Sequence, residues 1–261
     1  MRILMLLALL PACSLYFGGG SPSGEVPPDG SAGSATSYSL TTIRTLAGAH
    51  RIVGVDSDHA GGVWIAYQER TSSEVTLAHL DASNTTIREW SFEDPSEVSG
   101  IAVAADGVWV SHNAVGTIGT SGVTEHDLTT GTALRSYATE GQISDLEIQA
   151  GLLLLSSYQN QVIALDPTTG GTKWQMVTQV IPSTQTGIAA YGANLFVSSW
   201  DMNTLTLMDH SGGILGSATS PLLHTNVSAS VGLFLANDGA DRLILASDSQ
   251  IAWLKVPAIG G

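Results

Sequence analysis

The sequence predicts an all-β fold, a β-propeller of five four-stranded blades that is closed by an N-terminal outer strand. The first observation is a repeat: equivalent positions of five similar segments follow one another at intervals of 42 to 46 residues. These positions are Gly54, Gly100, Asp145, Gly187 and Gly232. The second observation is that no 11-residue window shows helical periodicity of comparable strength, so we expect few helices.

Each repeat contains four short strands, which we name a to d in chain order. In the second repeat, strand a (98–101) leads through an Asp106-Gly107 turn into strand b (107–110). Gly, Asn and Asp adopt the positive φ of such turns at little cost. In the third repeat, strand c alternates from Val162 to Asp166, and a Thr-Thr-Gly turn opens strand d at Thr172. The inner strands are more apolar than the outer ones, as in a propeller blade.

The two ends of the repeat array predict how the ring closes. The last repeat stops after its third strand, 251–256, while an additional strand, 41–46, precedes the first repeat. That strand can serve as the missing outer strand of the last blade, which removes an open sheet edge. A ring of four or six blades and a two-sheet sandwich are the alternatives, and the regular spacing disfavours the sandwich.

Two repeat segments resemble those of known propellers. Residues 100–110 (GIAVAADGVWV) are similar to the repeat of NHL-type and virginiamycin-B-lyase-like propellers. Residues 164–174 (ALDPTTGGTKW) are similar to the repeat of PQQ-like and YVTN propellers. The resemblance covers residues 41–257. It implies a propeller architecture, because the matching motifs mark turns and core strands. It implies no cofactor, since the chain is too short for the eight-bladed disc of quinoproteins.

The N-terminus is expected to carry a lipoprotein signal. Met1-Arg2 is basic, residues 3–10 are apolar, and residues 10–13 (LPAC) resemble the lipobox of bacterial lipoproteins. In that family the cysteine, here Cys13, is diacylated, and the chain is cut before it. An ordinary signal peptide or an uncleaved anchor with a coincidental cysteine is the alternative. Ser14 after the cysteine favours the outer membrane of a Gram-negative envelope.

Three segments are therefore expected. Residues 1–12 form the signal peptide, 13–37 a flexible tether rich in Ser, Gly and Pro, and 38–261 the propeller. The membrane is a partner only through the lipid anchor.

Composition excludes several classes of protein. The chain has 261 residues, of which 43% are hydrophobic, enough for a core. A net charge of −14, with nine Lys and Arg, argues against binding to nucleic acid. The single cysteine excludes a disulfide framework and any multi-thiolate metal site.

In propellers, the b–c and d–a loops share one face, which usually binds the ligand. Aromatic, amide and charged side chains gather there in the predicted alignment, and they suit a protein, peptide or glycan ligand. The candidates are Tyr67, Gln68, His112, Asn113, Tyr158, Trp200, Asp201 and His224. The simpler interpretation is that such loops are polar in every propeller and that the aromatics fill the rim of the channel.

Two acidic residues on an innermost strand are candidate channel residues. Asp145 occupies the position held by Gly in the other repeats, and Glu147 follows on the same strand. Such acids bind a cation or contact channel water.

No metal site or cofactor is predicted, because the seven histidines lack metal-ligand spacing. His79, His126 and His210 lie on outer hairpins and are expected to be solvated or hydrogen-bonding surface groups. The acids of the a–b turns have a complete explanation in turn chemistry.

A binding or interaction module anchored to the membrane outside the cytoplasm is the function that these observations favour. The alternative is a propeller-type lyase or lactone hydrolase with a His–acid site formed by His112, His224 and nearby acids. No G-x-S-x-G nucleophile motif is present.

Overall fold

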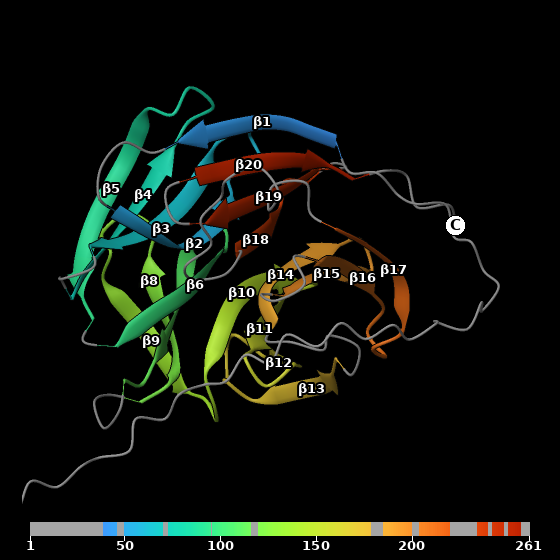
Figure 1. The fold of residues 1–261 in the computed structure, drawn as a ribbon. Coiled ribbons are helices and arrows are strands. Elements are labelled where there is room, and N and C mark those ends of the chain that lie inside the picture. The colour runs from blue at the N-terminus through green and yellow to red at the C-terminus, as the bar shows by residue number, and fades with distance from the viewer. Residues whose placement is uncertain are drawn as a thin grey trace, which may run out of the picture. The chain divides into compact units, whose positions relative to one another are not determined.

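The computed structural model contains five four-stranded antiparallel sheets arranged in a ring, which confirms the predicted five-bladed propeller (Figure 1). The structure describes residues 39–45, 50–69, 73–94, 96–115, 120–178, 185–199, 204–219, 234–239, 242–247 and 250–256. Within these ranges every regular element is a strand. Over the same residues, no helix with the length and apolarity needed to cross a membrane is found.

The first four blades each take four consecutive strands. Blade 1 contains β2 (His50–Ser57), β3 (Val63–Glu69), β4 (Glu74–Leu80) and β5 (Thr86–Glu93). Blade 2 contains β6 (Glu97–Val103), β7 (Gly107–Asn113), β8 (Gly122–Asp127) and β9 (Ala133–Ala138). Blade 3 contains β10 (Ile143–Gln149), β11 (Leu152–Ser157), β12 (Gln161–Leu165) and β13 (Thr172–Val177). Blade 4 contains β14 (Gln185–Tyr191), β15 (Asn194–Ser199), β16 (Thr204–Met208) and β17 (Ile214–Thr219).

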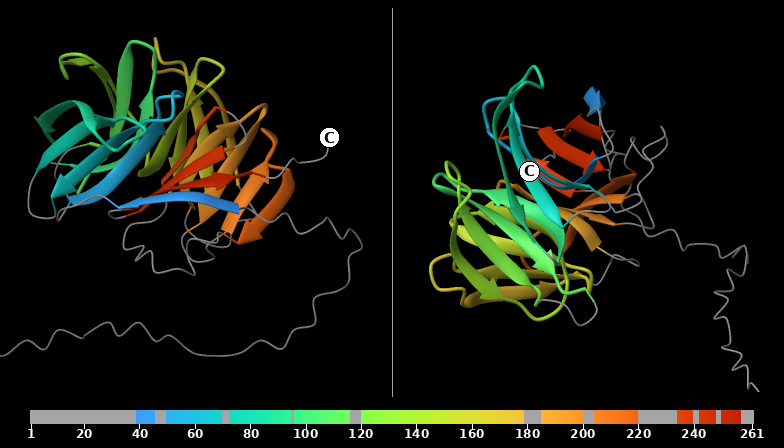
Figure 2. Two further views of the ribbon diagram at one scale, coloured as in Figure 1. Left: turned by 90° about the horizontal axis from the view of Figure 1, so that it is seen from above. Right: turned by 90° about the vertical axis from the view of Figure 1, so that its left-hand side faces the viewer.

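Blade 5 joins the two ends of the described chain. It contains β18 (Phe234–Asn237), β19 (Arg242–Ser247), β20 (Gln250–Lys255) and, as its outer strand, β1 (Ser39–Thr45). β1 pairs antiparallel with β20, from Ser39 opposite Lys255 to Thr45 opposite Gln250. The blue β1 accordingly runs beside the red strands in Figure 1 and in the left view of Figure 2. The predicted closure of the ring by an N-terminal outer strand is confirmed. This strand begins at Ser39, two residues before the predicted start.

Apolar side chains form five separate core clusters, one at each interface between neighbouring blades. The cluster between blades 1 and 2, for example, joins Trp64 and Leu77 to Ile101 and Val110. The inner strands have neighbouring blades on both faces, which explains why they are almost continuously apolar. The outer strands β5 and β9 are mostly exposed, and Ile87 on β5 is 60% exposed.

The c–d turns of blades 2 and 3 each contact the preceding blade. In blade 3, the Asp166 carboxylate accepts hydrogen bonds from the turn N–H groups of Thr168 and Thr169, at 2.8 and 3.2 Å. Gly170 completes this turn with a φ of +70°. Tyr137 of blade 2 packs on that glycine and donates its hydroxyl to the Thr168 carbonyl oxygen at 2.8 Å. The Thr-Thr-Gly motif is thus both a turn and a contact surface.

Near the axis, the innermost strands approach so closely that side chains are excluded. A Cβ on Gly54 would lie 2.8 Å from the Ile101 nitrogen, and one on Gly100 would lie 2.7 Å from the Cα of Asp145. Real Cβ contacts are not this short, so these positions require Gly. The third repeat alone departs from Gly at this position in the sequence, and Asp145 occupies the space beside Gly100, with its Oδ1 2.8 Å from the position of an added Cβ.

Candidate functional site

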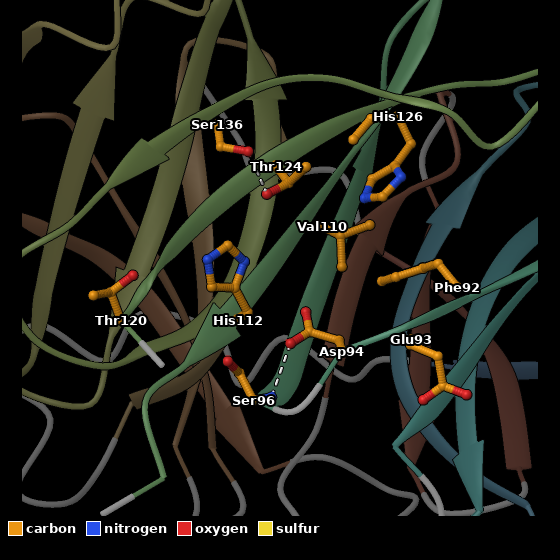
Figure 3. Close-up of a pocket in the computed structure, with 11 residues that line it drawn as sticks. Phe92, Glu93, Asp94, Ser96, Val110, His112, Thr120, Thr124, His126 and Ser136 are labelled. Carbon is orange, nitrogen blue, oxygen red and sulfur yellow. Dashed lines mark hydrogen bonds between the residues drawn. The ribbon is translucent and has the colours of Figure 1, made fainter. Parts of the chain in front are cut away.

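A pocket of about 380 Å³ lies between blades 1 and 2. We call it the interblade pocket and define it by Phe92, Glu93, Asp94, Ser96, Val110, His112, Thr120, Thr124, His126, Ala133 and Ser136 (Figure 3). Its volume is in the range of known ligand sites, about 300–1,000 Å³. One end lies at the b–c and d–a loops, which we call the top face.

The alternation of strands explains which side chains enter the interblade pocket. Val110 on β7 lies opposite Thr124 on β8, and both side chains face the pocket. His112 and His126 are two residues further along the same two strands, so they point to the same side. The end of β5 in blade 1 supplies the opposite wall, with Phe92, Glu93 and Asp94.

His126 is the most deeply buried polar residue of the pocket. It is 5% exposed, and its ring lies 4.6 Å from the ring of Phe92 and 5.4 Å from that of Trp90. Its Nδ1 lies 3.0 Å from the carbonyl oxygen of Gly131. Since a carbonyl only accepts, Nδ1 carries the proton in this geometry. Burial lowers the pKa of His126, which favours the neutral ring and leaves Nε2 as an acceptor.

The burial of His126 corrects the sequence prediction, which placed it at the surface. The other two outer-hairpin histidines agree better with the prediction. His210 is exposed and bonds to Gln149 at 2.9 Å, and the part-buried His79 bonds to Asp58 at 2.9 Å. His126 lies against two aromatic rings of blade 1, Trp90 and Phe92, whereas His79 and His210 each contact one ring, Trp64 and Trp174.

His112 and Asp94 lie toward the top end of the interblade pocket, near Ser96 and Thr120 in Figure 3. Burial lowers the pKa of His112 and outweighs the opposing effect of the Asp94 charge. One carboxylate oxygen of Asp94 accepts a hydrogen bond from the Ser96 N–H at 2.8 Å. Within the described ranges, no group of three His, Cys, Asp or Glu side chains is placed to hold a metal ion.

The predicted top-face residues separate into several environments. His112 lines the interblade pocket. Asn113, next to it, is 2% exposed and clamps blade 2 to blade 3: its Nδ2 donates to the Ile143 carbonyl, and its Oδ1 accepts from the Ile143 N–H, both at 2.7 Å. Tyr67 packs against the core between blades 5 and 1, and Gln68 is buried.

Tyr158 lies in a separate, charged environment. Its burial, the charge of Glu97 and, less strongly, the charge of Asp145 raise its pKa to about 12. Glu97 pairs with Arg51 at 3.6 Å. The remaining predicted residues, Trp200, Asp201, His224 and the lipidation candidate Cys13, lie outside the described residues.

Asp145 is fully buried at the axis, where its carboxylate accepts three backbone hydrogen bonds. The donors are Leu146 on its own strand at 2.9 Å, Ile188 of blade 4 at 3.1 Å and Leu235 of blade 5 at 3.1 Å. Glu147 accepts from Ile148 at 2.8 Å and from Ala190 of blade 4 at 2.9 Å. These acceptors satisfy N–H groups of inner strand edges that have no further strand to pair with.

Burial dominates the acid–base behaviour of these channel acids. It raises the pKa of Asp145 well above its usual range despite the three hydrogen bonds. Burial, with the charge of Asp56 as a second cause, raises the pKa of Glu147 to about 8. Asp56 belongs with these acids because its charge acts on Glu147. Burial raises the pKa of Asp56 to about 7, and its carboxylate accepts a hydrogen bond from the Val103 N–H at 2.6 Å.

A second pocket of about 660 Å³ opens at the opposite end of blades 1 and 2. Its wall contains Trp64, which stacks on His79 with ring centres 4.6 Å apart. His79 bonds to Asp58, whose other oxygen accepts from the N–H groups of Ala60 and Gly62 at 2.8 Å. Asp58 and His79 are thus engaged with each other and with the a–b turn, and Arg88 donates to the Leu128 carbonyl at 2.9 Å.

Comparisons with known proteins support the fold alone. No protein-family model and no curated protein matches the chain. Among solved structures, the glutaminyl cyclase of Myxococcus xanthus is similar, with 13% identity and a TM-score of 0.66 over 84% of this chain and 97% of the other. A chain of the mitotic checkpoint complex is similar at 16% identity and a TM-score of 0.50, over 94% of this chain and 72% of that one.

Proposed function

We propose that this propeller is a binding module whose ligand site is the interblade pocket between blades 1 and 2. One observation carries the proposal: the buried ring of His126 lines this pocket, and its Nε2 has no hydrogen-bond partner among the described residues. An accessible acceptor on a buried ring, in a preformed cavity with a few converging polar groups, is typical of a ligand site. His112 and Asp94 add further polar atoms at the top end.

The ligand of such a pocket is a small group, presented by a protein, a peptide or a glycan. Thermal unfolding of the full chain with acetylated amino-acid amides, dipeptides and monosaccharides tests this proposal. We expect at least one class to raise the unfolding temperature in a concentration-dependent way, because a ligand that binds only the folded state stabilises it.

Two variants on one strand provide the control. Ser136 lines the interblade pocket and is exposed, so Ser136→Trp fills the pocket without disturbing the core. Leu134 on the same strand is 51% exposed and does not line the pocket, so Leu134→Trp is the matched control. If Ser136→Trp loses the ligand-induced rise in unfolding temperature and Leu134→Trp keeps it, the interblade pocket is supported as the ligand site. If no compound raises the unfolding temperature of the native chain, the proposal is contradicted.

An enzyme is the second candidate. One of the solved structures similar to this chain is a glutaminyl cyclase, and the neutral His112 beside Asp94 has the chemistry of a general base. Conversion of any compound of the panel, or cyclisation of a glutaminyl peptide, would favour this candidate, provided that His112→Gln abolishes it. Unchanged compounds together with a saturable shift favour the binding module.

The expected setting of the module is the bacterial cell envelope, with a lipid on Cys13 and residues 13–37 as the tether. Intact-mass analysis of the mature chain tests this expectation. A chain that begins at Cys13 and carries a thioether-linked diacylglycerol supports the anchor, and an unmodified Cys13 or a different first residue contradicts it.

A further inference from the structure

We propose that the interblade pocket selects an organic cation, a primary ammonium or guanidinium group. This inference rests on the proposed binding function and adds the charge of the ligand to it. It depends on three properties of the pocket: the protonation pattern of its buried histidine, its uncompensated carboxylates and its aromatic wall.

The buried histidine of the pocket presents a hydrogen-bond acceptor to it. The Gly131 carbonyl, 3.0 Å from Nδ1, fixes the proton of the neutral His126 ring on that nitrogen. The 5% exposed ring therefore presents the lone pair of Nε2 to the pocket. A ligand satisfies this atom only by donating a hydrogen bond.

The charged groups of the pocket are carboxylates. Asp94 uses one oxygen for the Ser96 N–H, and the described residues offer no partner to the other oxygen. Glu93 accepts a hydrogen bond from the Ser73 hydroxyl. Neither acid forms an ion pair within the described part of the chain, and no described Lys or Arg lines the pocket. The uncompensated negative charge attracts a cation and repels an anion.

The remaining wall suits the carbon part of such a ligand. Phe92 and Val110 are apolar, and the ring of Phe92 lies 4.6 Å from that of His126, tilted by 34°. A methylene chain lies on these side chains, and an ammonium or guanidinium gains from a nearby aromatic face. A metal ion fits the described residues poorly, because no three ligating side chains are placed around one point.

Isothermal titration calorimetry of the full chain at pH 7.5 tests the inference with matched probes. We compare Nα-acetyl-lysine N-methylamide with its norleucine analogue, which lacks only the ammonium group, and with the glutamate analogue. The lysine derivative is expected to bind at least about ten-fold more tightly than either, a difference of about 1.4 kcal/mol.

Three variants locate the effect in the pocket. Asp94→Asn removes the charge, and His126→Phe removes the acceptor while keeping a ring against Trp90 and Phe92. We expect each to weaken binding of the lysine derivative at least about ten-fold. Glu140→Gln removes the same charge from an exposed residue outside the pocket. Its affinity for the lysine derivative is expected to stay within about two-fold of that of the native chain.

Further arms of the titration identify the source of the cation. If butylammonium binds as tightly as the lysine derivative, the ligand is a free amine. If butylammonium binds more weakly, the ligand is a cationic side chain on a peptide. Both results support the inference. Equal binding of the norleucine analogue, equal losses in Asp94→Asn and Glu140→Gln, or displacement of the amine by micromolar zinc chloride overturns it. If only a neutral or anionic ligand binds, and Ser136→Trp blocks it, the inferred preference for a cation is wrong but the proposed binding function stands. If no ligand binds at all, both the inference and the proposed function are wrong.

Discussion

The carboxylate of Asp145 on blade 3 accepts a hydrogen bond from the backbone N–H of Leu235 on blade 5, at 3.1 Å across the axis of the ring. The same oxygen accepts from Ile188 of blade 4 at 3.1 Å, so one side chain connects three blades. A glycine, which the other repeats have at this position, cannot make these contacts. Asp145 therefore closes the centre of the propeller.

Removal of this carboxylate should destabilise the fold. Asp145→Ala leaves three buried N–H groups without their acceptor, and each unsatisfied group costs about 1–3 kcal/mol. We expect urea unfolding to show a loss of about 3 kcal/mol or more, and a smaller loss for Asp145→Asn, which keeps one acceptor oxygen. Asp106→Ala, at an exposed turn, is the control and should change stability by less than about 0.5 kcal/mol. Equal stability of Asp145→Ala and the native chain would refute the structural role of this residue.

The contact between Tyr137 and Gly170 predicts a second stability effect. Gly170 has a φ of +70°, and an added Cβ would lie 2.6 Å from Cγ of Tyr137. Gly151 has a φ of +76° with open space around its Cβ position. Both changes to Ala incur backbone strain of about 1–2 kcal/mol, but only Gly170→Ala adds overpacking of about 1–3 kcal/mol. The unfolding temperature of Gly170→Ala should therefore be lower than that of Gly151→Ala. The reverse order would contradict the packing of Tyr137 on Gly170.

The channel acids predict that stability falls as the pH rises from about 4 to 8. In the unfolded chain such acids titrate near pH 4, whereas in the fold the pKa is about 7 for Asp56, about 8 for Glu147 and well raised for Asp145. The folded state thus binds more protons over this range, and deprotonation favours unfolding. We expect calorimetry to show a lower unfolding temperature at pH 8 than at pH 5, and a flatter profile for Glu147→Gln. A rise in unfolding temperature between these pH values would contradict the assignment.

Binding of the lysine derivative should weaken in acid. The groups that face the interblade pocket are Glu93, Asp94, His112 and His126. Burial lowers the pKa of both histidines below the usual value of about 6.5, so both are neutral at pH 7 and become cationic on acidification. We expect an unchanged affinity from pH 7 to 8 and a progressive loss at lower pH, as the two histidines become protonated, measured by titration calorimetry. Tighter binding at pH 5 would be inconsistent with an acceptor role for His126.

Most of the fold could be predicted from the sequence, because it follows from local signals. The repeat spacing, the turn residues and the unpaired strand at each end determined five blades and their closure, down to the pairing of β1 with β20. Asp145 also stood out, because it replaces a glycine of the repeat. Its bond to Leu235 could not be predicted, since it depends on the radius of the closed ring.

The candidate site was less predictable, because its residues come from two blades. His112 was selected as a strand-b end, but His126 was assigned to the surface from the exposure typical of outer hairpins. Its burial depends on Trp90 and Phe92 of the preceding blade. Asn113 has the composition of a binding residue, yet it bonds to the backbone of Ile143. One signal was available: Thr124 and His126 are two residues apart on a strand, and therefore share a face with the opposite residue Val110.

Nitrogen-15 NMR of the histidine rings tests the central claim most directly. In the free chain at pH 7.5, we predict that Nδ1 of His126 is protonated and that Nε2 is not. Addition of Nα-acetyl-lysine N-methylamide should shift the Nε2 signal of His126 and leave that of the exposed His210, which is bonded to Gln149, unchanged. A protonated Nε2 in the free chain, or a His126 signal that does not respond while the ligand binds elsewhere, would contradict the account of the interblade pocket.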